Sequence, residues 1–169
     1  MTQSIVVAID GSDIAERALD KAISLAKAFD ASLTIVHVLL HGRDISALQK
    51  MAEVELSAES APSVDLPLAA AGLLNAYREK AAHEKAVVVI GDYLTGKAAN
   101  QARAAGVKTV TTRIEDGEVS EAINRVITSV DADTMVMGSR GLGGVKEFLL
   151  GSVSHEICQK APCTVVIVK

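Results

Sequence analysis

The chain has 169 residues, of which 49% are hydrophobic and 22% are charged, and its formal net charge is −4. This length suits one domain with a sizeable core, and the composition is that of an ordinary globular protein. Aromatic residues make up only 2%, so the stacking platforms that usually hold single-stranded nucleic acid are not expected. Because the net charge is negative and no Lys/Arg cluster stands out, nucleic acid is not an expected partner.

The sequence also predicts the cellular setting. No apolar run approaches the roughly 20 residues that span a bilayer, so membrane insertion is not expected. Residues 1–9 pass straight into a strand pattern without a basic n-region, which predicts a cytoplasmic protein without a signal peptide. Cys158 and Cys163 are spaced neither as a CxxC pair nor as a metal site. We expect two reduced, partly buried thiols.

Five segments have the aliphatic, β-branched composition of buried parallel strands. In chain order they are Ser4–Ile9, Ser32–Leu39, Val107–Ile114, Thr134–Met137 and Cys163–Val168. Apolar residues at helical spacing predict helices over Asp13–Phe29, Val119–Val130 and Ser154–Lys160. Strand and helix therefore alternate at both ends of the chain, which predicts an α/β fold, doubly wound, with helices on both faces of a parallel sheet.

The middle of the chain is mostly helical by composition. Asp44–Glu59 is predicted to be a helix and Ala61–Pro67, with two prolines, a loop. Leu68–Ala105 is rich in helix formers and is predicted to be one long helix, kinked at Gly91 or Gly96. Within it, Val87–Gly91 taken alone would also fit a strand. No repeat or low-complexity linker interrupts the chain, so residues 1–169 are predicted to form a single domain.

A glycine-rich stretch over residues 138–154 begins where a predicted strand ends and finishes where a helix begins. Glycines let the backbone come close to a ligand because no Cβ intervenes. A helix N-terminus presents free N–H groups and a partial positive charge, which suits phosphate. Ser152 and Ser154 add hydroxyl groups there. The stretch therefore predicts an anion site, most electropositive at Gly151–Ser154.

Two familiar phosphate-binding loops are excluded. A P-loop needs GxxxxGK[ST], and neither Gly-Lys-Ser nor Gly-Lys-Thr occurs in the chain. The dinucleotide fingerprint GxGxxG should follow the first strand, which here leads into Asp10-Gly11-Ser12 instead.

A third pattern does match. Gly138, two residues, Gly141, nine residues and Gly151-Ser152 form the G-2x-G-9x-G-[S/T] signature, which resembles that of ATP-binding universal stress proteins. The first strand with its Asp10-Gly11-Ser12 end, Val36-His37-Val38 and Ala161–Val165 are similar to that family as well. The resemblance is clear over about 1–42 and 104–169. It implies a single open sheet of five parallel strands in the order 3-2-1-4-5, with Asp10 and Gly138 at neighbouring strand ends where ligands bind.

The resemblance also implies a role for each matching residue. Asp10 and the main chain of Val38 would contact adenine or ribose, and Gly138 and Arg140 would flank the ribose and phosphates. The triphosphate, with Mg²⁺ carried by it, would lie against Gly141, Gly151, Ser152, Val153 and Ser154. Apolar walls for the base would come from Ala8, Val36 and Met137.

Plainer interpretations of the same residues stay open. Asp10 could only cap the first helix, Arg140 could pair with a surface carboxylate, and Gly143-Gly144 could be a mobile loop. His37, on an apolar strand, is expected to be a packed core histidine, and His155 to be exposed to solvent. The whole glycine pattern could also be a structural turn.

The function that the resemblance implies is a regulatory, stress-response module. It would bind ATP, or ADP or AMP, and act through an unidentified protein partner. A homodimer is expected through the uncharged last strand, Thr164–Val168. Hydrolysis should be slow or absent, since Glu147 is the one carboxylate between Gly138 and Ser154 and no base is evident.

Three other functions compete with this one. The chain could be an ATPase or adenylyl transferase of the same architecture, although SGGxDS, HxGH and KMSKS-like motifs are absent. It could be an interaction protein without nucleotide, against which the intact signature argues. A flavodoxin-type carrier is disfavoured because the chain has no Trp and its two tyrosines, Tyr77 and Tyr93, lie in the helical middle.

Overall fold

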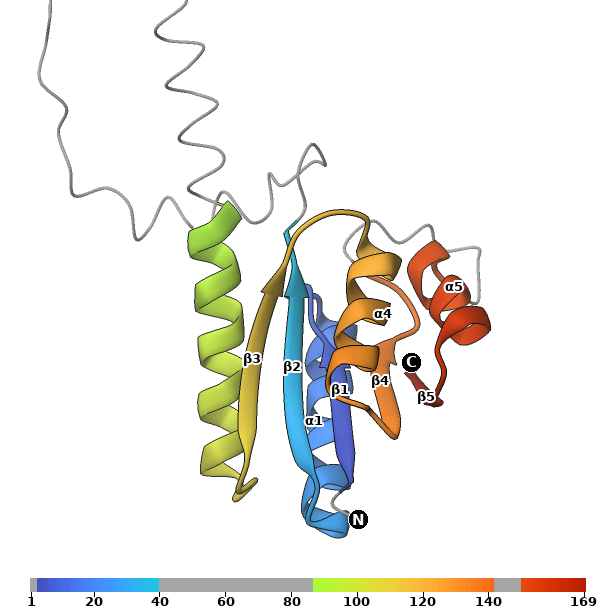
Figure 1. The fold of residues 1–169 in the computed structure, drawn as a ribbon. Helices are drawn as coiled ribbons and strands as arrows, with labels where there is room; N and C mark the ends of the chain where they lie inside the picture. Colours follow the sequence, from blue (N-terminus) through green and yellow to red (C-terminus); the bar gives the residue numbers. More distant parts are fainter. Residues whose placement is uncertain (1–2, 40–86, 142–149) are drawn as a thin grey trace, which may run out of the picture. The chain divides into compact units, whose positions relative to one another are not determined.

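The computed structural model describes residues 3–39, 87–141 and 150–169, and its centre is a five-stranded sheet (Figure 1). The strands are β1 (Ser4–Ala8), β2 (Ser32–Val38), β3 (Val110–Glu115), β4 (Thr134–Gly138) and β5 (Thr164–Val168). All neighbours pair in parallel, in the order β3-β2-β1-β4-β5. The predicted fold class and strand order are confirmed.

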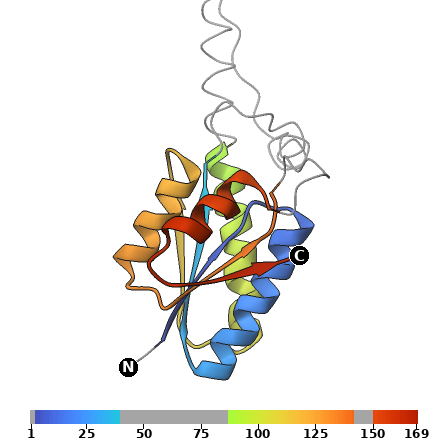
Figure 2. The same ribbon diagram turned by 90° about the vertical axis from the view of Figure 1, so that its right-hand side faces the viewer.

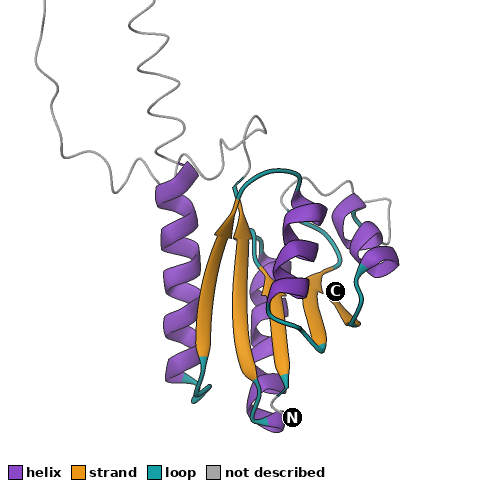
Figure 3. Cartoon of the chain, viewed as in Figure 1, coloured by secondary structure: helices purple, strands orange, loops and turns teal. Residues whose placement is uncertain are grey.

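Helices cover both faces of the sheet (Figures 2 and 3). One face carries α1 (Asp13–Phe29) and the helical residues 91–104, while the other carries α4 (Val119–Ser129) and α5 (Ser152–Lys160). The first pair is joined by hydrogen bonds of 2.8 Å from Lys97 to Glu16 and from Gln101 to Asp20. No helix in the described segments is long and apolar enough to cross a membrane.

The sequence explains both the bounds and the orientation of α1. The hydroxyl of Ser12 accepts a hydrogen bond from the N–H of Ala15 at 3.3 Å, which caps the first turn. At the other end Asp30 adopts the left-handed conformation that often terminates helices. Its buried stripe consists of Ala15, Ala18, Leu19, Ala22, Ile23 and Ala26. The predicted bounds, Asp13–Phe29, are confirmed.

The long middle helix is confirmed where it is described. Residues 87–104 are helical, so the strand alternative for Val87–Gly91 is wrong, and helix formers on both sides explain why. The predicted helix Asp44–Glu59, the loop Ala61–Pro67 and residues 68–86 lie outside the described residues. The chain divides into one unit of Met1–Leu39 with Gly91–Lys169 and another of Leu40–Ile90. A single domain over 1–169 stays a prediction.

The third strand begins later than Val107, the predicted start. Gly106 has a φ of +95°, and its N–H donates to Arg103 O while the N–H of Val107 donates back to Ala102 O at 3.1 Å. These bonds are those of a helix C-terminal cap with a left-handed glycine. Val107 therefore belongs to the C-terminal cap of the preceding helix, and β3 starts at Val110.

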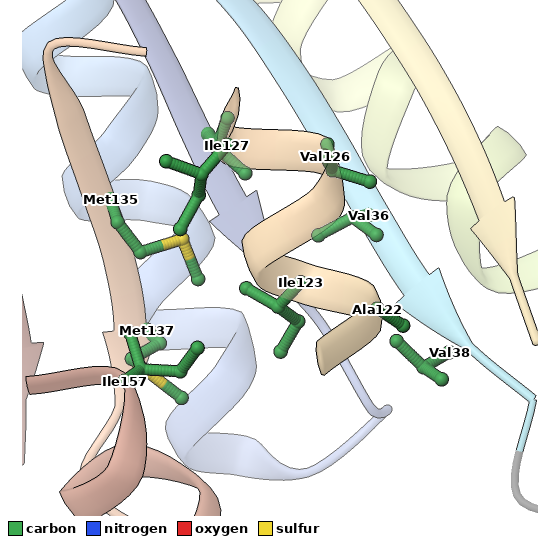
Figure 4. Packing of buried hydrophobic residues seen from close by; sticks show 10 residues of the cluster. Val36, Val38, Ala122, Ile123, Val126, Ile127, Met135, Met137 and Ile157 are labelled. Carbon is green, nitrogen blue, oxygen red and sulfur yellow. The ribbon is translucent and has the colours of Figure 1, made fainter. Parts of the chain in front are cut away.

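The core beneath α4 is made of aliphatic and methionine side chains (Figure 4). Val6, Val36 and Met135 project from three adjacent strands toward Ile123 and Ile127 of α4. Each of these side chains is at most 2% exposed, and burying one contributes about 1.5–3 kcal/mol. This packing fixes α4 on the sheet and so holds the C-terminal strand ends in place.

Candidate functional site

The C-terminal ends of β1 and β4 lie side by side in the middle of the sheet. The strand order reverses here, since the chain runs from β1 to β2 in one direction and from β4 to β5 in the other. Asp10 follows β1, and Gly138 is the last residue of β4. Ligands of open α/β sheets bind outside the carboxyl ends of the strands at such a point.

Asp10 and Gly141 come close together at this point. A Cβ atom built on Gly141 would overlap Oδ2 of Asp10. The other carboxylate oxygen, Oδ1, accepts hydrogen bonds from the N–H of Ser12 at 3.0 Å and from its hydroxyl at 2.6 Å. Ser12, not Asp10, supplies the cap of α1. The half-buried Asp10 carboxylate is thus oriented by the turn after β1 and faces the glycine-rich stretch.

Gly138 and Arg140 lie on either side of the buried Ser139. Gly138 pairs with Val168 of β5, and a Cβ on it would lie 2.7 Å from Cγ2 of Ile14, so β4 ends tightly against α1. Arg140 is half-buried, and its Nε has no hydrogen-bond partner among the described residues. No ion pair between Arg140 and a carboxylate occurs in that part of the chain either. A buried N–H without an acceptor is costly, and a bound anion would supply one.

The N-terminus of α5 points to the same region. Gly151 is the N-cap and contributes no side-chain hydrogen bond. As in any α-helix, the N–H groups of the first turn, here Ser152, Val153 and Ser154, have no acceptor within the helix. The side chain of Ser152 is exposed, whereas that of Val153 packs against the core, so Val153 offers only its main chain. These groups form the electropositive point that the sequence predicts.

Ser154 has a different role from the one expected of its hydroxyl. The side chain is only 2% exposed, and its Oγ donates to the carbonyl of Ser139 at 2.8 Å, with the Gly151 carbonyl as a second acceptor at 3.0 Å. The N–H of Gly151 donates to the same Ser139 carbonyl at 2.8 Å. The hydroxyl of Ser154 therefore ties the start of α5 to the end of β4, and its N–H is the group left for a ligand.

Sequence reasoning missed Ser12 and Ser139 as the residues that organise the site. Ser139 is 3% exposed, and its N–H donates to the carbonyl of Val168 at 2.7 Å. It thereby connects the glycine-rich stretch to β5 on one side and to α5 on the other. The position of Ser139 inside the G-2x-G spacing was the available signal, but a serine between glycines does not indicate which groups it will hydrogen-bond.

The end of β2 completes the site on its other side. The N–H of Ile9 donates to the carbonyl of Val36, and β2 runs on to Val38 beyond the end of β1 at Ala8. Alternate residues of a parallel strand turn their main-chain groups to the same neighbour. The main chain of Val38 therefore faces the space beyond β1. The side chains of Val36 and Met137, expected as walls for a base, are buried in the core under α4, and Ala8 is half-buried.

His37 lies at this end of β2, directly before Val38. The ring is 2% exposed, and Nδ1 lies 2.9 Å from the carbonyl oxygen of Ile9. Burial lowers the pKa of His37, and the backbone hydrogen bond and the charge of Asp10 oppose this less strongly. The neutral ring donates its Nδ1–H to Ile9, so the expected core histidine also makes a specific polar contact.

Two further features bear on the predicted ligand. His155 is exposed and its Nε2 lies 3.1 Å from Nε2 of Gln159, as expected of a surface residue. Gly143, Gly144 and Glu147 lie outside the described residues. Within the described segments, no group of three His, Cys, Asp or Glu side chains is arranged to hold a metal ion.

The fold and the placement of these residues define a doubly wound α/β protein with a polar site at its topological switch point. The model of the universal stress protein family matches residues 1–169. A putative universal stress protein of Staphylococcus saprophyticus is 34% identical over 168 residues, which cover 99% of this chain and 83% of the relative. The chain belongs to the universal stress protein family, as its motifs indicated.

Solved structures agree with this assignment. A universal stress protein in complex with cAMP is 25% identical, with a TM-score of 0.60 over 99% of this chain and 96% of the other. An Arabidopsis thaliana protein of the family, with AMP bound, is 20% identical, with a TM-score of 0.62 over 99% of this chain and 91% of the other. The second likeness shows the fold alone.

Proposed function

We propose that this protein binds an adenine nucleotide across the C-terminal ends of β1 and β4, ATP being the form that its signature favours. One observation carries the proposal. Asp10 and Gly141, far apart in the sequence, meet at the switch point so closely that a Cβ at residue 141 would overlap the Asp10 carboxylate. A glycine-rich stretch that served only as a turn would not need to press its backbone against a carboxylate at the ligand-binding edge of the sheet.

The phosphate end of the proposed site is the start of α5. Its first-turn N–H groups carry the positive end of the helix dipole, and the cap residue Gly151 leaves them uncovered. Ser152 is exposed beside them, and the Nε of Arg140, which has no partner among the described residues, is an additional donor. These donors are neutral or cationic, and they can therefore bind a negatively charged polyphosphate that carries Mg²⁺.

The nucleoside end is formed by Asp10 and the main chain of Val38. A carboxylate can accept hydrogen bonds from ribose hydroxyls, and main-chain N–H and C=O groups can pair with an adenine edge. The universal stress protein described in complex with cAMP binds an adenine nucleotide, which supports the same ligand class here.

A series of ligands with different numbers of phosphates tests both ends. Titration calorimetry with adenosine, AMP, ADP and ATP, the last two with Mg²⁺, should give affinities that rise with each phosphate. Mass spectrometry of the ligand released from freshly purified, denatured protein should find an adenine nucleotide. If GTP binds as tightly as ATP, the adenine assignment fails. If adenosine binds as tightly as ATP, the phosphate assignment fails.

We propose further that the bound nucleotide serves as a regulatory state, read by a protein partner in the cytoplasm. Phosphoryl transfer to water needs a group that positions the nucleophile as well as donors that neutralise charge. The described part of the site offers donors, while its carboxylate, Asp10, is engaged with Ser12 at the nucleoside end. Slow hydrolysis follows, which disfavours the alternative of an ATPase or adenylyl transferase.

The proposed quaternary structure is a homodimer through β5. This strand pairs with β4 on one side and ends the sheet on the other. Its sequence, Thr-Val-Val-Ile-Val, has no charged residue, whereas β3 at the opposite edge contains Arg113 and Glu115. Charges protect an edge strand from pairing, and their absence favours pairing with a second copy.

A further inference from the structure

The imidazole of His37 is hydrogen-bonded to the carbonyl of Ile9, which lies just beyond the end of β1. β1 ends at Ala8, and the next residue, Ile9, has its N–H bonded to the carbonyl of Val36 at 2.9 Å. Its carbonyl accepts from Nδ1 of His37, also at 2.9 Å. Two residues of β2 therefore bind Ile9: the backbone of Val36 binds its N–H, and the buried side chain of His37 binds its carbonyl.

The contact with His37 connects the two residues of the proposed nucleoside end. Asp10 directly follows the held carbonyl, and Val38 directly follows His37 in the chain. The hydrogen bond between the Ile9 carbonyl and His37 thus links the Asp10 turn to the end of β2, where the buried Val38 follows His37.

We propose that His37 is a positioning residue for the nucleoside end of the site: its neutral ring, through the carbonyl of Ile9, sets the distance between Asp10 and the Val38 main chain. The inference rests on the proposed function and deepens it. His37 touches neither base nor phosphate in this role. It acts on adenosine binding through its neighbours.

The surroundings of His37 make the neutral ring the required form. The middle helix presents Gly91, and a Cβ built there would lie 3.2 Å from Cδ2 of His37 and 3.2 Å from Cδ2 of Leu39. β3 presents Ile114, the strand partner of His37. Among the described residues, Asp10 is the charged group whose field acts on the ring. An imidazolium here would lack water and have one carboxylate to offset its charge.

Two substitutions at His37 separate positioning from packing. His37→Leu fills the space but leaves the Ile9 carbonyl without its donor. His37→Asn has an amide that can replace Nδ1–H and cannot be protonated. Calorimetry should show that His37→Leu weakens the binding of adenosine and of Mg²⁺·ATP by the same factor, about tenfold, which corresponds to about 1.4 kcal/mol. His37→Asn should restore most of the affinity.

A matched glycine pair tests the same idea without touching His37. The added methyl of Gly91→Ala presses on the ring, whereas that of Gly96→Ala, in the same helix, has no atom of the described residues within 4 Å. Gly91→Ala should weaken adenosine binding and Gly96→Ala should not.

The possible results distinguish this inference from the proposed function. If the unaltered protein binds neither adenosine nor ATP at pH 8, the proposed function is wrong. If the unaltered protein binds both ligands, and His37→Leu and Gly91→Ala bind each of them as tightly as the unaltered protein does, the proposed site stands and the role of His37 is refuted. A loss in His37→Leu for ATP alone would also refute it, because the effect would then lie at the phosphates.

Discussion

Replacing Gly141 by alanine should destabilise the protein because of one carboxylate oxygen. An added methyl would overlap Oδ2 of Asp10, so either the Asp10 turn or the chain at 141 must move. Forcing an extra carbon into a filled site costs about 1–3 kcal/mol, while Gly-to-Ala substitution returns about 0.4–1 kcal/mol through the unfolded chain. We expect a net loss of about 1–2 kcal/mol in the free energy of unfolding.

A double-mutant cycle assigns this loss to the pair. Asp10→Ala removes the obstructing oxygen, along with the two hydrogen bonds from Ser12. Urea unfolding should therefore show that Asp10→Ala/Gly141→Ala is about as stable as Asp10→Ala alone, a coupling of about 1–2 kcal/mol. Additive losses in the double variant, or an unaltered stability of Gly141→Ala, would refute the close approach of these residues.

Gly151→Ala is the matched control within the same signature. A Cβ there would lie 3.5 Å from the Ser139 carbonyl oxygen, an ordinary contact, and Gly151 has a φ of −72°, which any residue adopts. Its stability should change by no more than about 0.5 kcal/mol. Affinity for ATP should nevertheless fall, since the added methyl stands at the N–H groups of α5.

Three other predictions concern pH, assembly and turnover. Because the pKa of His37 is lowered in the folded protein, the unfolded chain binds more protons below the ordinary histidine pKa of about 6.5, so the free energy of unfolding should decrease as the pH falls below that value. In His37→Asn this decrease should be smaller. An equal decrease with pH in the two proteins would contradict the lowered pKa of His37. Light scattering at micromolar concentration should give the mass of a dimer, and Val166→Lys in β5 should give a monomer; a monomeric unaltered protein would rule out pairing through β5. Steady-state phosphate release from ATP should be far slower than the roughly 10 s⁻¹ typical of enzymes, and a rate near that value, lost in Asp10→Ala, would show that the protein is an ATPase.

The sequence predicted the sheet well because its signals are local. β-branched runs bounded by turn residues identified all five strands, and the capped amphipathic segment gave the bounds of α1. Errors fell at element ends. Val107 looks like the first residue of a strand, but after the left-handed Gly106 its N–H bonds to the carbonyl of Ala102 in the helix. Composition does not reveal the partner of this single N–H. α5 begins at Ser152 rather than Ser154 for the same kind of reason.

The site was only partly predictable. Spacing and family resemblance located Asp10, Gly138, Gly141 and the start of α5, and the structure brings these four together. It could not be foreseen that the Ser154 hydroxyl turns inward to Ser139, or that Ser12 orients Asp10. Such contacts join segments that meet only after folding. His37 shows the same limit, since its apolar strand predicted burial correctly but not its hydrogen bond to Ile9.

Titration of the purified protein with Mg²⁺·ATP by calorimetry tests the central proposal most directly, provided that any copurified nucleotide is first removed. We expect saturable binding of one nucleotide per chain, weakened in Gly141→Ala and in Gly151→Ala even though only the first of these is destabilised. Absence of binding at millimolar ATP, or unchanged affinity in both variants, would contradict the assignment of a nucleotide site to the ends of β1 and β4.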